Sequence, residues 1–334
     1  MTRVEIPGLE VSDPALEAEL RIGLDHVERF LEKTVQADYD MLSEAAAYLL
    51  AAGGKRFRPM LVLLAGYFGD PKDARLVPGA AAIELTHVAT LHHDDVIDEA
   101  ESRHGVPSVN ARWSNSVAIV SGDYLFARAA EIASDLGTEV TRLLARTIAT
   151  VSNGQIREVS TAGQLNQNER AYMETIRRKT ASLIATSCRL GGLLSDAPPD
   201  QVEVLDQFGD AVGLGFQLSD DIMDVTASER ELGKEPGVDM KEGVYTLPVL
   251  HAMAHGDRRD ELVELLRPGP PEGDRLHRAL AIVRGDGSLS HARAAVTREV
   301  RRARELAERL PGGAARTALE TLARFIADRC SAEA

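Results

Sequence analysis

Two short runs of aspartates are spaced as metal chemistry requires. The first aspartate motif comprises Asp94, Asp95 and Asp98, and the second comprises Asp220, Asp221 and Asp224. Each follows the pattern DDxxD, and residues three or four apart lie on one face of a helix. Carboxylate oxygens are hard ligands, and magnesium in proteins prefers a few carboxylates, several waters and a substrate phosphate. Each motif is therefore a candidate magnesium site.

A single DDxxD is more often a solvated helix face or a complement to a helix N-terminus. Two copies, each at the C-terminal end of a mostly apolar helical stretch, reverse that balance. If the two motifs face each other, six carboxylates repel and raise one another's pKa unless cations lie between them. A ligand that such cations bridge is a diphosphate, and we expect one here.

Composition excludes several classes of protein. The net charge of −14 argues against nucleic acid or an anionic membrane surface as a partner. No apolar run approaches the roughly 20 residues of a membrane span, and the acidic N-terminus does not resemble a secretory signal. Cys188 and Cys330 are too few for a disulfide framework, which fits a reducing compartment. We expect a cytoplasmic protein without a membrane span.

The apolar periodicity predicts an all-α chain, and strand alternation is absent from it. We interpret residues 1–334 as one domain with a loose N-terminal leader over 1–15. The hydrophobic content of 44% is enough for a sizeable core, which must be built from aliphatic side chains because aromatics make up 4%. Loops are expected between Pro71 and Pro78, at 101–110, at 232–248 and around Pro268–Pro271. Helices are expected within 16–50, then over about 60–68, 79–98, 117–133, 139–160, 168–194 and from Pro199 to Asp224, with others ending near Arg329.

Basic residues accompany both motifs. The run from Gly53 to Pro59 reads Gly-Gly-Lys-Arg-Phe-Arg-Pro, and its Lys55 and Arg58 suit phosphate oxygens; the alternative is a helix end with solvated charges. Arg103 either neutralises nearby acids or binds a ligand. Lys179 lies in a small, apolar stretch, so it needs an anionic partner such as a diphosphate, unless it snorkels to the surface.

In this order the motifs resemble those of trans-type polyprenyl diphosphate synthases, members of the isoprenoid synthase superfamily. The resemblance runs from residue 53 to Pro248 and more weakly to Arg329. It implies an all-α orthogonal helical bundle around a central active-site cavity, and a homodimer. It also implies the head-to-tail condensation of isopentenyl diphosphate with an allylic diphosphate.

The resemblance assigns roles residue by residue. The six aspartates would bind three magnesium ions and, with Lys179, form the catalytic set. The substrate-binding residues would be Lys55, Arg58 and His87 for isopentenyl diphosphate, Arg103, His104, Lys179 and Lys234 for the allylic diphosphate, and Thr180 and Gln217 near the allylic cation. The chain departs from the family pattern where His104 replaces a second arginine, which weakens that contact or makes it sensitive to pH. It departs again where Val244 replaces a lysine, for which Lys241 is a candidate substitute.

Product length depends on the helix before the first aspartate motif. The growing tail is expected to run along this helix away from the metals. Thr90 lies one turn, about 5.4 Å, below Asp94. Ala89 and Thr90 are small, as in long-chain relatives, and the next turn offers Thr86 and Ile83. We therefore expect a medium-to-long all-trans product.

Two alternatives stay open at this point, and a third is discounted. The enzyme makes geranylgeranyl diphosphate or something shorter, if a deeper residue closes the tail pocket. The chain is a non-catalytic subunit of a heteromeric prenyl diphosphate synthase, although both aspartate motifs are whole. A class I terpene cyclase also has a DDxxD on a helical bundle, but its second metal site normally mixes Asn or Asp with Ser or Thr and Glu, which differs from the run Gln217–Asp224.

Overall fold

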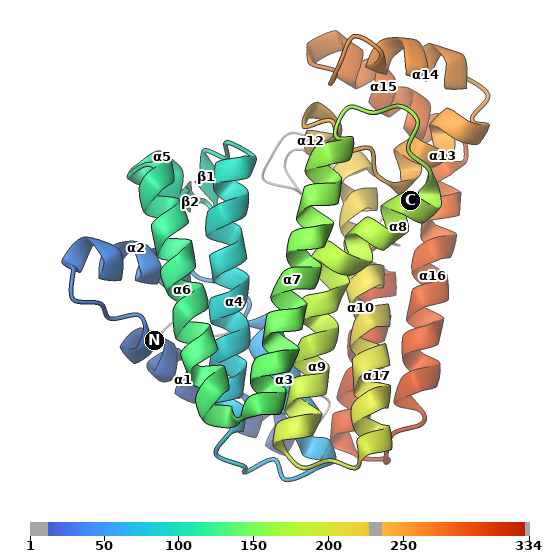
Figure 1. Cartoon of the computed structure of the whole chain (residues 1–334). Helices are drawn as coiled ribbons and strands as arrows, with labels where there is room; N and C mark the ends of the chain where they lie inside the picture. The colour runs from blue at the N-terminus through green and yellow to red at the C-terminus, as the bar shows by residue number, and fades with distance from the viewer. Residues whose placement is uncertain (1–12, 227–235, 331–334) are drawn as a thin grey trace. The chain divides into compact units, whose positions relative to one another are not determined.

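The computed structural model describes residues 13–226 and 236–330 (Figure 1). Helices make up nearly all of the ordered elements, so the all-α prediction is confirmed. The backbone divides into two compact units. Unit 1 comprises residues 1–149, 183–209 and 306–321, and unit 2 comprises residues 150–182, 210–305 and 322–334. Helices α7 (Thr138–Thr161), α10 (Pro199–Thr226), α16 (Ser288–Ala307) and α17 (Ala314–Arg329) contribute residues to both units.

Unit 1 holds the first aspartate motif. Its other elements are α1 (Pro14–Thr34), α2 (Asp40–Ala51), α3 (Phe57–Ala65), the 3-10 turn η1 (Gly66–Phe68), α4 (Leu76–Ile97), β1 (Ser102–Arg103), β2 (Val106–Pro107), α5 (Val109–Arg112), α6 (Asn115–Leu136) and nearly all of α9 (Ser182–Leu194). Helix α4 contacts α1, α3, α5 and α6, and it is buried on most of its surface. A helix that is apolar all round belongs in a core, and α4 is the core helix of this unit.

Close packing fixes α6 against α4, as the two neighbouring ribbons in Figure 1 show. At Gly122 of α6, a Cβ would lie 2.4 Å from Nε2 of His93 and 3.3 Å from the carbonyl oxygen of Ala89. Only glycine allows this approach, which brings the backbone of α6 directly alongside the turn that precedes the first aspartate motif.

Two helix starts were predicted too late. Pro14 and Ala15 belong to α1 rather than to a leader, because the side chain of Asp13 caps the helix by accepting from the backbone N–H groups of Ala15 and Leu16 at 2.9 and 3.1 Å. Helix α4 begins at Leu76 and so includes Pro78, which we had placed in a loop. Proline is tolerated in a first helical turn because the missing N–H would be unpaired there anyway.

The predicted loop after α4 contains a short β-ribbon. Ser102 pairs with Pro107 and Arg103 with Val106 in a two-stranded antiparallel ribbon, and the short helix α5 follows it. The connecting residues His104 and Gly105 have φ of +53° and +77°. Positive φ at both positions is the requirement of a tight hairpin turn, and the ribbon gives Arg103 a defined place.

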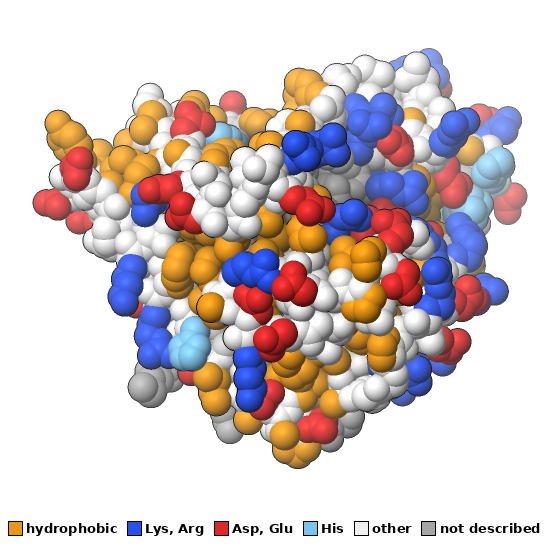
Figure 2. All heavy atoms as spheres, turned by 60° about the horizontal axis from the view of Figure 1, so that its bottom comes forward, with side chains coloured by type: hydrophobic (Ala, Val, Ile, Leu, Met, Phe, Trp, Pro, Cys, Tyr) orange, Lys and Arg blue, Asp and Glu red, His pale blue; other side chains and the backbone are white. Residues whose placement is uncertain are grey.

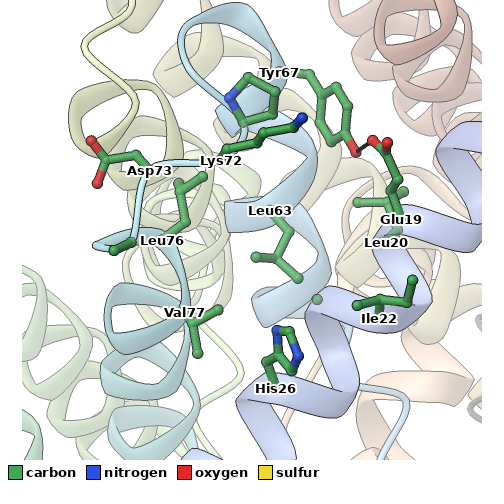
Figure 3. A pocket seen from close by; sticks show the side chains of 13 residues that line it. Glu19, Leu20, Ile22, His26, Leu63, Tyr67, Lys72, Asp73, Leu76 and Val77 are labelled. Carbon is green, nitrogen blue, oxygen red and sulfur yellow. Dashed lines mark hydrogen bonds between the residues drawn. The ribbon is translucent and has the colours of Figure 1, made fainter.

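An outer groove of about 370 Å³ lies in unit 1 among α1, α3 and the start of α4 (Figure 3). Leu20, Leu63 and Leu76 contribute apolar lining, and at its edge the hydroxyl of Tyr67 donates to Glu19 over 2.6 Å. None of the residues that we predict for the site lines this groove. It is therefore separate from the chemistry considered below.

Unit 2 holds the second aspartate motif. Its remaining elements are α8 (Glu169–Ile176), the π-helical turn η2 (Arg177–Ala181), α12 (Val238–Lys241), α13 (Leu247–His255), α14 (Arg259–Leu266) and α15 (Gly273–Gly285). The predicted helix over 168–194 is thus interrupted by a π turn, and the predicted loop over 232–248 contains α12. A π turn within a helix often marks a functional position, and this one carries Lys179 and Thr180.

Two glycines make room for the π turn. A Cβ at Gly154 of α7 would lie 2.5 Å from the backbone nitrogen of Lys179. A Cβ at Gly213 of α10 would lie 2.5 Å from the Cα of Ala181. The turn is therefore held by backbone contact on both sides, which fixes the starting point of the Lys179 side chain.

We predict that Gly154→Ala costs about 3 kcal/mol of unfolding free energy, because the added methyl group meets backbone atoms that cannot rotate away. Catalytic activity should fall with it as Lys179 is displaced. Urea denaturation and a turnover assay check both effects. Gly285→Ala is the matched control, since a Cβ there meets nothing within 4 Å; an equal loss in this variant would contradict the packing argument.

The surface is mixed in charge. Over the face shown in Figure 2, basic side chains lie next to acidic ones, with apolar side chains between them. Within residues 13–226 and 236–330, the length and apolarity that a membrane crossing demands are not combined in any helix.

Candidate functional site

The first aspartate motif lies at the C-terminal end of α4. Asp95 is fully buried, and its Oδ1 accepts from Nε and Nη2 of Arg103 at 2.8 and 2.5 Å. Its Oδ2 is buried with no hydrogen-bond partner among the described residues. Asp94 is half-buried and Asp98 is exposed. Carboxylates at a helix C-terminus face the negative end of the helix dipole, so this arrangement favours a bound cation.

Electrostatics support the same interpretation. Burial raises the pKa of Asp95 above its ordinary value, and the guanidinium of Arg103 offsets part of that rise. A buried acceptor with a free oxygen is costly unless it gains a partner. The unpartnered oxygen of Asp95, together with the carboxylates of Asp94 and Asp98, is a set of hard donors that fits magnesium.

A basic cluster lies beside this motif and comprises Arg58, His87, Arg103 and His104. The pKa of His87 is held well below its ordinary value, first by burial and then by the charges of Arg58, His104 and Arg103. The pKa of His104 is lowered as well, by burial and by Arg103. Both imidazoles are therefore neutral donors near fixed positive charge, and the cluster suits an anion. Lys55, at the entrance of the same turn as Arg58, is exposed.

In unit 2, the second aspartate motif centres on a hydrogen-bonded chain. Thr180 Oγ1 donates to Gln217 Oε1 over 2.9 Å, and Gln217 Nε2 donates to Asp221 Oδ1 over 3.0 Å. The hydroxyl of the buried Tyr172 donates to Asp221 Oδ2. Burial raises the pKa of Asp221 to about 7, even though these two hydrogen bonds act to lower it. Each oxygen of the Asp221 carboxylate therefore accepts a hydrogen bond, which fixes the orientation of the group.

The flanking aspartates of the second motif have different partners. Asp220 accepts from Nη2 of Arg329 over 2.5 Å, and the Arg329 guanidinium also lies 4.5 Å from the ring centre of Phe216. Asp224 is nearly buried and accepts from the backbone N–H groups of Val238 and Asp239 at 3.2 and 3.3 Å. Asp224 therefore ties the end of α10 to α12.

The second aspartate of each motif plays the same structural part. Asp95 and Asp221 are both buried and both held by side-chain donors, whereas Asp94, Asp98 and Asp220 are more exposed. Within the described residues, no three His, Cys, Asp or Glu side chains are already gathered in a metal-binding geometry. The predicted ligands are present, with Asp95 and Asp220 paired to arginines in this structure.

The remaining predicted residues are three lysines and the chain-length residues of α4. Lys179 forms an ion pair with Glu158 of α7, and Lys241, the candidate substitute at the Val244 departure, is half-buried in α12. Lys234 lies outside the described residues. Ile83, Thr86 and Ala89 are fully buried in unit 1, and Thr90 is half-buried with its hydroxyl donating to the carbonyl of His87 over 2.7 Å.

Sequence reasoning missed three residues of the site. Tyr172, Glu158 and Arg329 each contact a predicted functional side chain. A weak signal existed for Tyr172, because in the uninterrupted helix predicted over 168–194 it lies seven residues, or two turns, before Lys179. Arg329 comes more than a hundred residues after Asp220, and its sequence neighbourhood carries no such signal.

His92 supplies a pH prediction. It is fully buried between the motif and α6, where Nδ1 lies 2.8 Å from Ser121 Oγ and Nε2 has no partner among the described residues. Burial lowers its pKa to about 4. As pH falls from 6.5 towards 4, His92 binds a proton in the unfolded chain but stays neutral in the folded chain. This residue should therefore cost about 3 kcal/mol of stability over that window.

Urea denaturation at several pH values measures the effect. His92→Gln should flatten the acid side of the stability profile relative to the wild type. His277→Gln, at an exposed histidine of α15, is the control and should leave the profile unchanged. Identical slopes in the wild type and His92→Gln would show that the buried histidine does not control this dependence.

Solved structures that match this fold include two prenyl diphosphate synthases. A decaprenyl diphosphate synthase from Rhodobacter capsulatus matches with a TM-score of 0.88 at 33% identity, covering 94% of this chain and 98% of that one. A geranylgeranyl pyrophosphate synthase from Corynebacterium glutamicum, solved with calcium and isoprenyl diphosphate, matches with a TM-score of 0.84 at 38% identity, covering 95% and 98%. The fold class is therefore that of the isoprenyl diphosphate synthases.

Two curated relatives cover almost the whole chain. A nonaprenyl diphosphate synthase from Mycobacterium tuberculosis is 37% identical over 326 residues, which is 97% of this chain and 97% of the relative. Component 2 of a heptaprenyl diphosphate synthase from Geobacillus stearothermophilus is 43% identical over 307 residues, covering 91% and 94%. The polyprenyl synthetase model matches residues 39–283, and the chain belongs to that family. It is an enzyme of the trans-prenyltransferase class, a polyprenyl diphosphate synthase.

Proposed function

We propose that this enzyme condenses isopentenyl diphosphate with an allylic diphosphate, uses magnesium, and makes a medium-to-long all-trans product. One observation carries the proposal. On α4, the buried Asp95 presents an unpartnered carboxylate oxygen beside a basic cluster, and small residues occupy the turn below. Groups suited to cation binding and to diphosphate binding, and small residues one turn below them, thus follow one another along a single helix.

Different residues of the chain bind the metal and each of the two substrates. When bound, magnesium supplies positive charge that stabilises the departing diphosphate. The six aspartates are its ligands. Lys55, Arg58 and His87 hold isopentenyl diphosphate. The imidazole of His87 is neutral, and its one N–H group donates a hydrogen bond to a phosphate oxygen. Arg103, His104, Lys179 and Lys234 hold the allylic diphosphate.

The hydrogen-bonded chain of Thr180, Gln217 and Asp221 in unit 2 also contributes to the reaction. Thr180 and Gln217 present oxygen dipoles where the allylic cation develops, and their mutual hydrogen bond keeps both oriented. Burial of the surrounding aliphatic side chains excludes water, which would otherwise quench that cation. The new bond joins C1 of the allylic group to C4 of isopentenyl diphosphate and leaves the positive charge on C3. A proton is then lost from the adjacent C2 to the released diphosphate, which restores a double bond.

Product length follows from α4. Thr90 lies about one turn, 5.4 Å, from Asp94 on the same face. Neither Ala89 nor Thr90 is bulky, and we propose that the tail starts along the half-buried side of α4 at Thr90. Ala89, Thr86 and Ile83 are fully buried in this structure, so the tail would have to displace their packing to pass them. The relatives with which the chain aligns end to end include a nonaprenyl diphosphate synthase, which supports a long product.

A product assay tests the proposal directly. The purified protein is incubated with magnesium, farnesyl diphosphate and excess isopentenyl diphosphate, and the products are read by mass spectrometry. A ladder that extends well past geranylgeranyl supports a long-chain synthase. A stop at geranylgeranyl or earlier would contradict the length assignment while leaving the condensation intact.

A second candidate is a subunit role in a heteromeric synthase. The relative from Geobacillus stearothermophilus is named a synthase component, and His104 and Val244 depart from the family pattern. Failure to elongate any allylic primer alone would favour this candidate. The homodimer and the cytoplasmic location expected from the sequence stay predictions, and size-exclusion chromatography with light scattering tests the first.

A further inference from the structure

A buried carboxylate lies beneath the phosphate-binding turn, outside the residues to which the resemblance assigns a role. Glu84 of α4 is 4% exposed, and its Oε1 accepts from Nη1 of Arg56 over 3.0 Å. The same guanidinium donates to Glu28 of α1 and, over 2.7 Å, to the carbonyl of Leu50 in α2. A charge buried this deeply is costly unless it is paired, so the position demands an explanation.

The backbone of the turn is shaped around this contact. Arg56 has φ of +44°, a left-handed conformation that is unfavourable for a long side chain and is usually left to glycine, asparagine or aspartate. At Gly54, a Cβ would lie 2.8 Å from Nη1 of Arg56, so the guanidinium folds back over a position where only glycine leaves space. The turn thus adopts a strained conformation that brings Arg56 inward to Glu84. Lys55 and Arg58 flank Arg56 in the sequence and do not take part in this contact with Glu84, so we assign them to phosphate binding.

Glu84 also acts on Arg58. Burial lowers the pKa of Arg58, and Glu84 is the charge that raises it. Arg58 Nε is buried with no hydrogen-bond partner among the described residues. His87 follows Glu84 by three residues and therefore shares its face of α4. Arg58, a member of the basic cluster, thus keeps an unsatisfied donor and feels the charge of one buried carboxylate.

We propose that Glu84 is a positioning residue for isopentenyl diphosphate: through its ion pair with Arg56 it locks the Lys55–Arg58 turn onto α4 and so sets the position of Arg58. This inference rests on the proposed function. Glu28 also pairs with Arg56, but from α1 and with a side chain that is 32% exposed, whereas the side chain of Glu84 is 5% exposed on α4, the helix that carries His87. The two carboxylates therefore separate anchoring of the turn to α4 from general support of the turn.

The test compares Glu84→Gln with Glu28→Gln. In Glu84→Gln the KM for isopentenyl diphosphate should rise about tenfold, as expected for a weakened charge-assisted contact, with kcat within about threefold of wild type. Glu28→Gln should lower the unfolding midpoint but leave that KM within about twofold. Equal KM values in Glu84→Gln and the wild type, or equal rises in both variants, would overturn the proposal.

Two further measurements keep the test decisive. Calorimetric titration of inorganic pyrophosphate needs no turnover, and Glu84→Gln should bind it about tenfold more weakly than wild type. If the wild type binds pyrophosphate but does not consume isopentenyl diphosphate, the proposed function fails while the positioning role is still measured. If Glu84→Gln does not fold, Glu84→Asp keeps the charge one methylene away, and an unchanged pyrophosphate affinity in it would overturn the proposal.

Discussion

Asp95→Asn is expected to lower kcat by roughly 10³-fold, while the folded state loses little stability. The substitution preserves the shape of the side chain and removes the charge that a cation needs. The carboxylate of Asp95 is fully buried with one oxygen unpaired, and burial raises its pKa, so its charge is unfavourable for folding on its own account. A group of this kind contributes to function more than to stability.

Rates over a series of magnesium concentrations, with thermal unfolding alongside, provide the measurement. Asp135→Asn, at an exposed aspartate on α6 of the same unit, should match the wild type in both. If Asp95→Asn kept a tenth or more of the activity at every magnesium concentration, Asp95 would not be a ligand. If it instead unfolded, the pair with Arg103 would be primarily structural.

The sequence predicted best what is local to one helix. The apolar periodicity before Asp94 and before Asp220 specified two helices and placed a carboxylate group at the end of each. Spacing of three and four residues is sufficient for such statements, because it reflects the geometry of a single helix. The positions of His87, Thr90 and Asp94 along α4 follow from the same rule.

Contacts between helices were beyond this reasoning. The hydrogen bond from Tyr172 to Asp221 and the ion pair of Arg329 with Asp220 join residues that are 49 and 109 positions apart. Their existence depends on how helices pack, which periodicity does not encode. The hairpin at His104 was missed for another reason: its left-handed turn residue is a histidine, whereas asparagine or aspartate before the glycine is the usual signal.

Thr90→Phe is expected to shorten the product to geranylgeranyl diphosphate or less, with total condensation largely retained. The aromatic ring would stand about one turn, 5.4 Å, below Asp94, in the path that we propose for the tail. Thr90 is the better position for this change than Ala89. Ala89 is fully buried where its carbonyl meets the close approach of Gly122, so a large side chain there would disrupt packing between α4 and α6.

The control must separate bulk from the lost hydroxyl. Thr90 donates to the carbonyl of His87 over 2.7 Å, and Thr90→Val removes that hydrogen bond at nearly constant volume. Mass spectra of the products should show a full-length ladder for Thr90→Val and a truncated one for Thr90→Phe. A full-length ladder from Thr90→Phe would mean that the tail leaves the first aspartate motif along another surface. Truncation in both variants would instead identify the His87 hydrogen bond, rather than the volume at Thr90, as the feature that sets chain length.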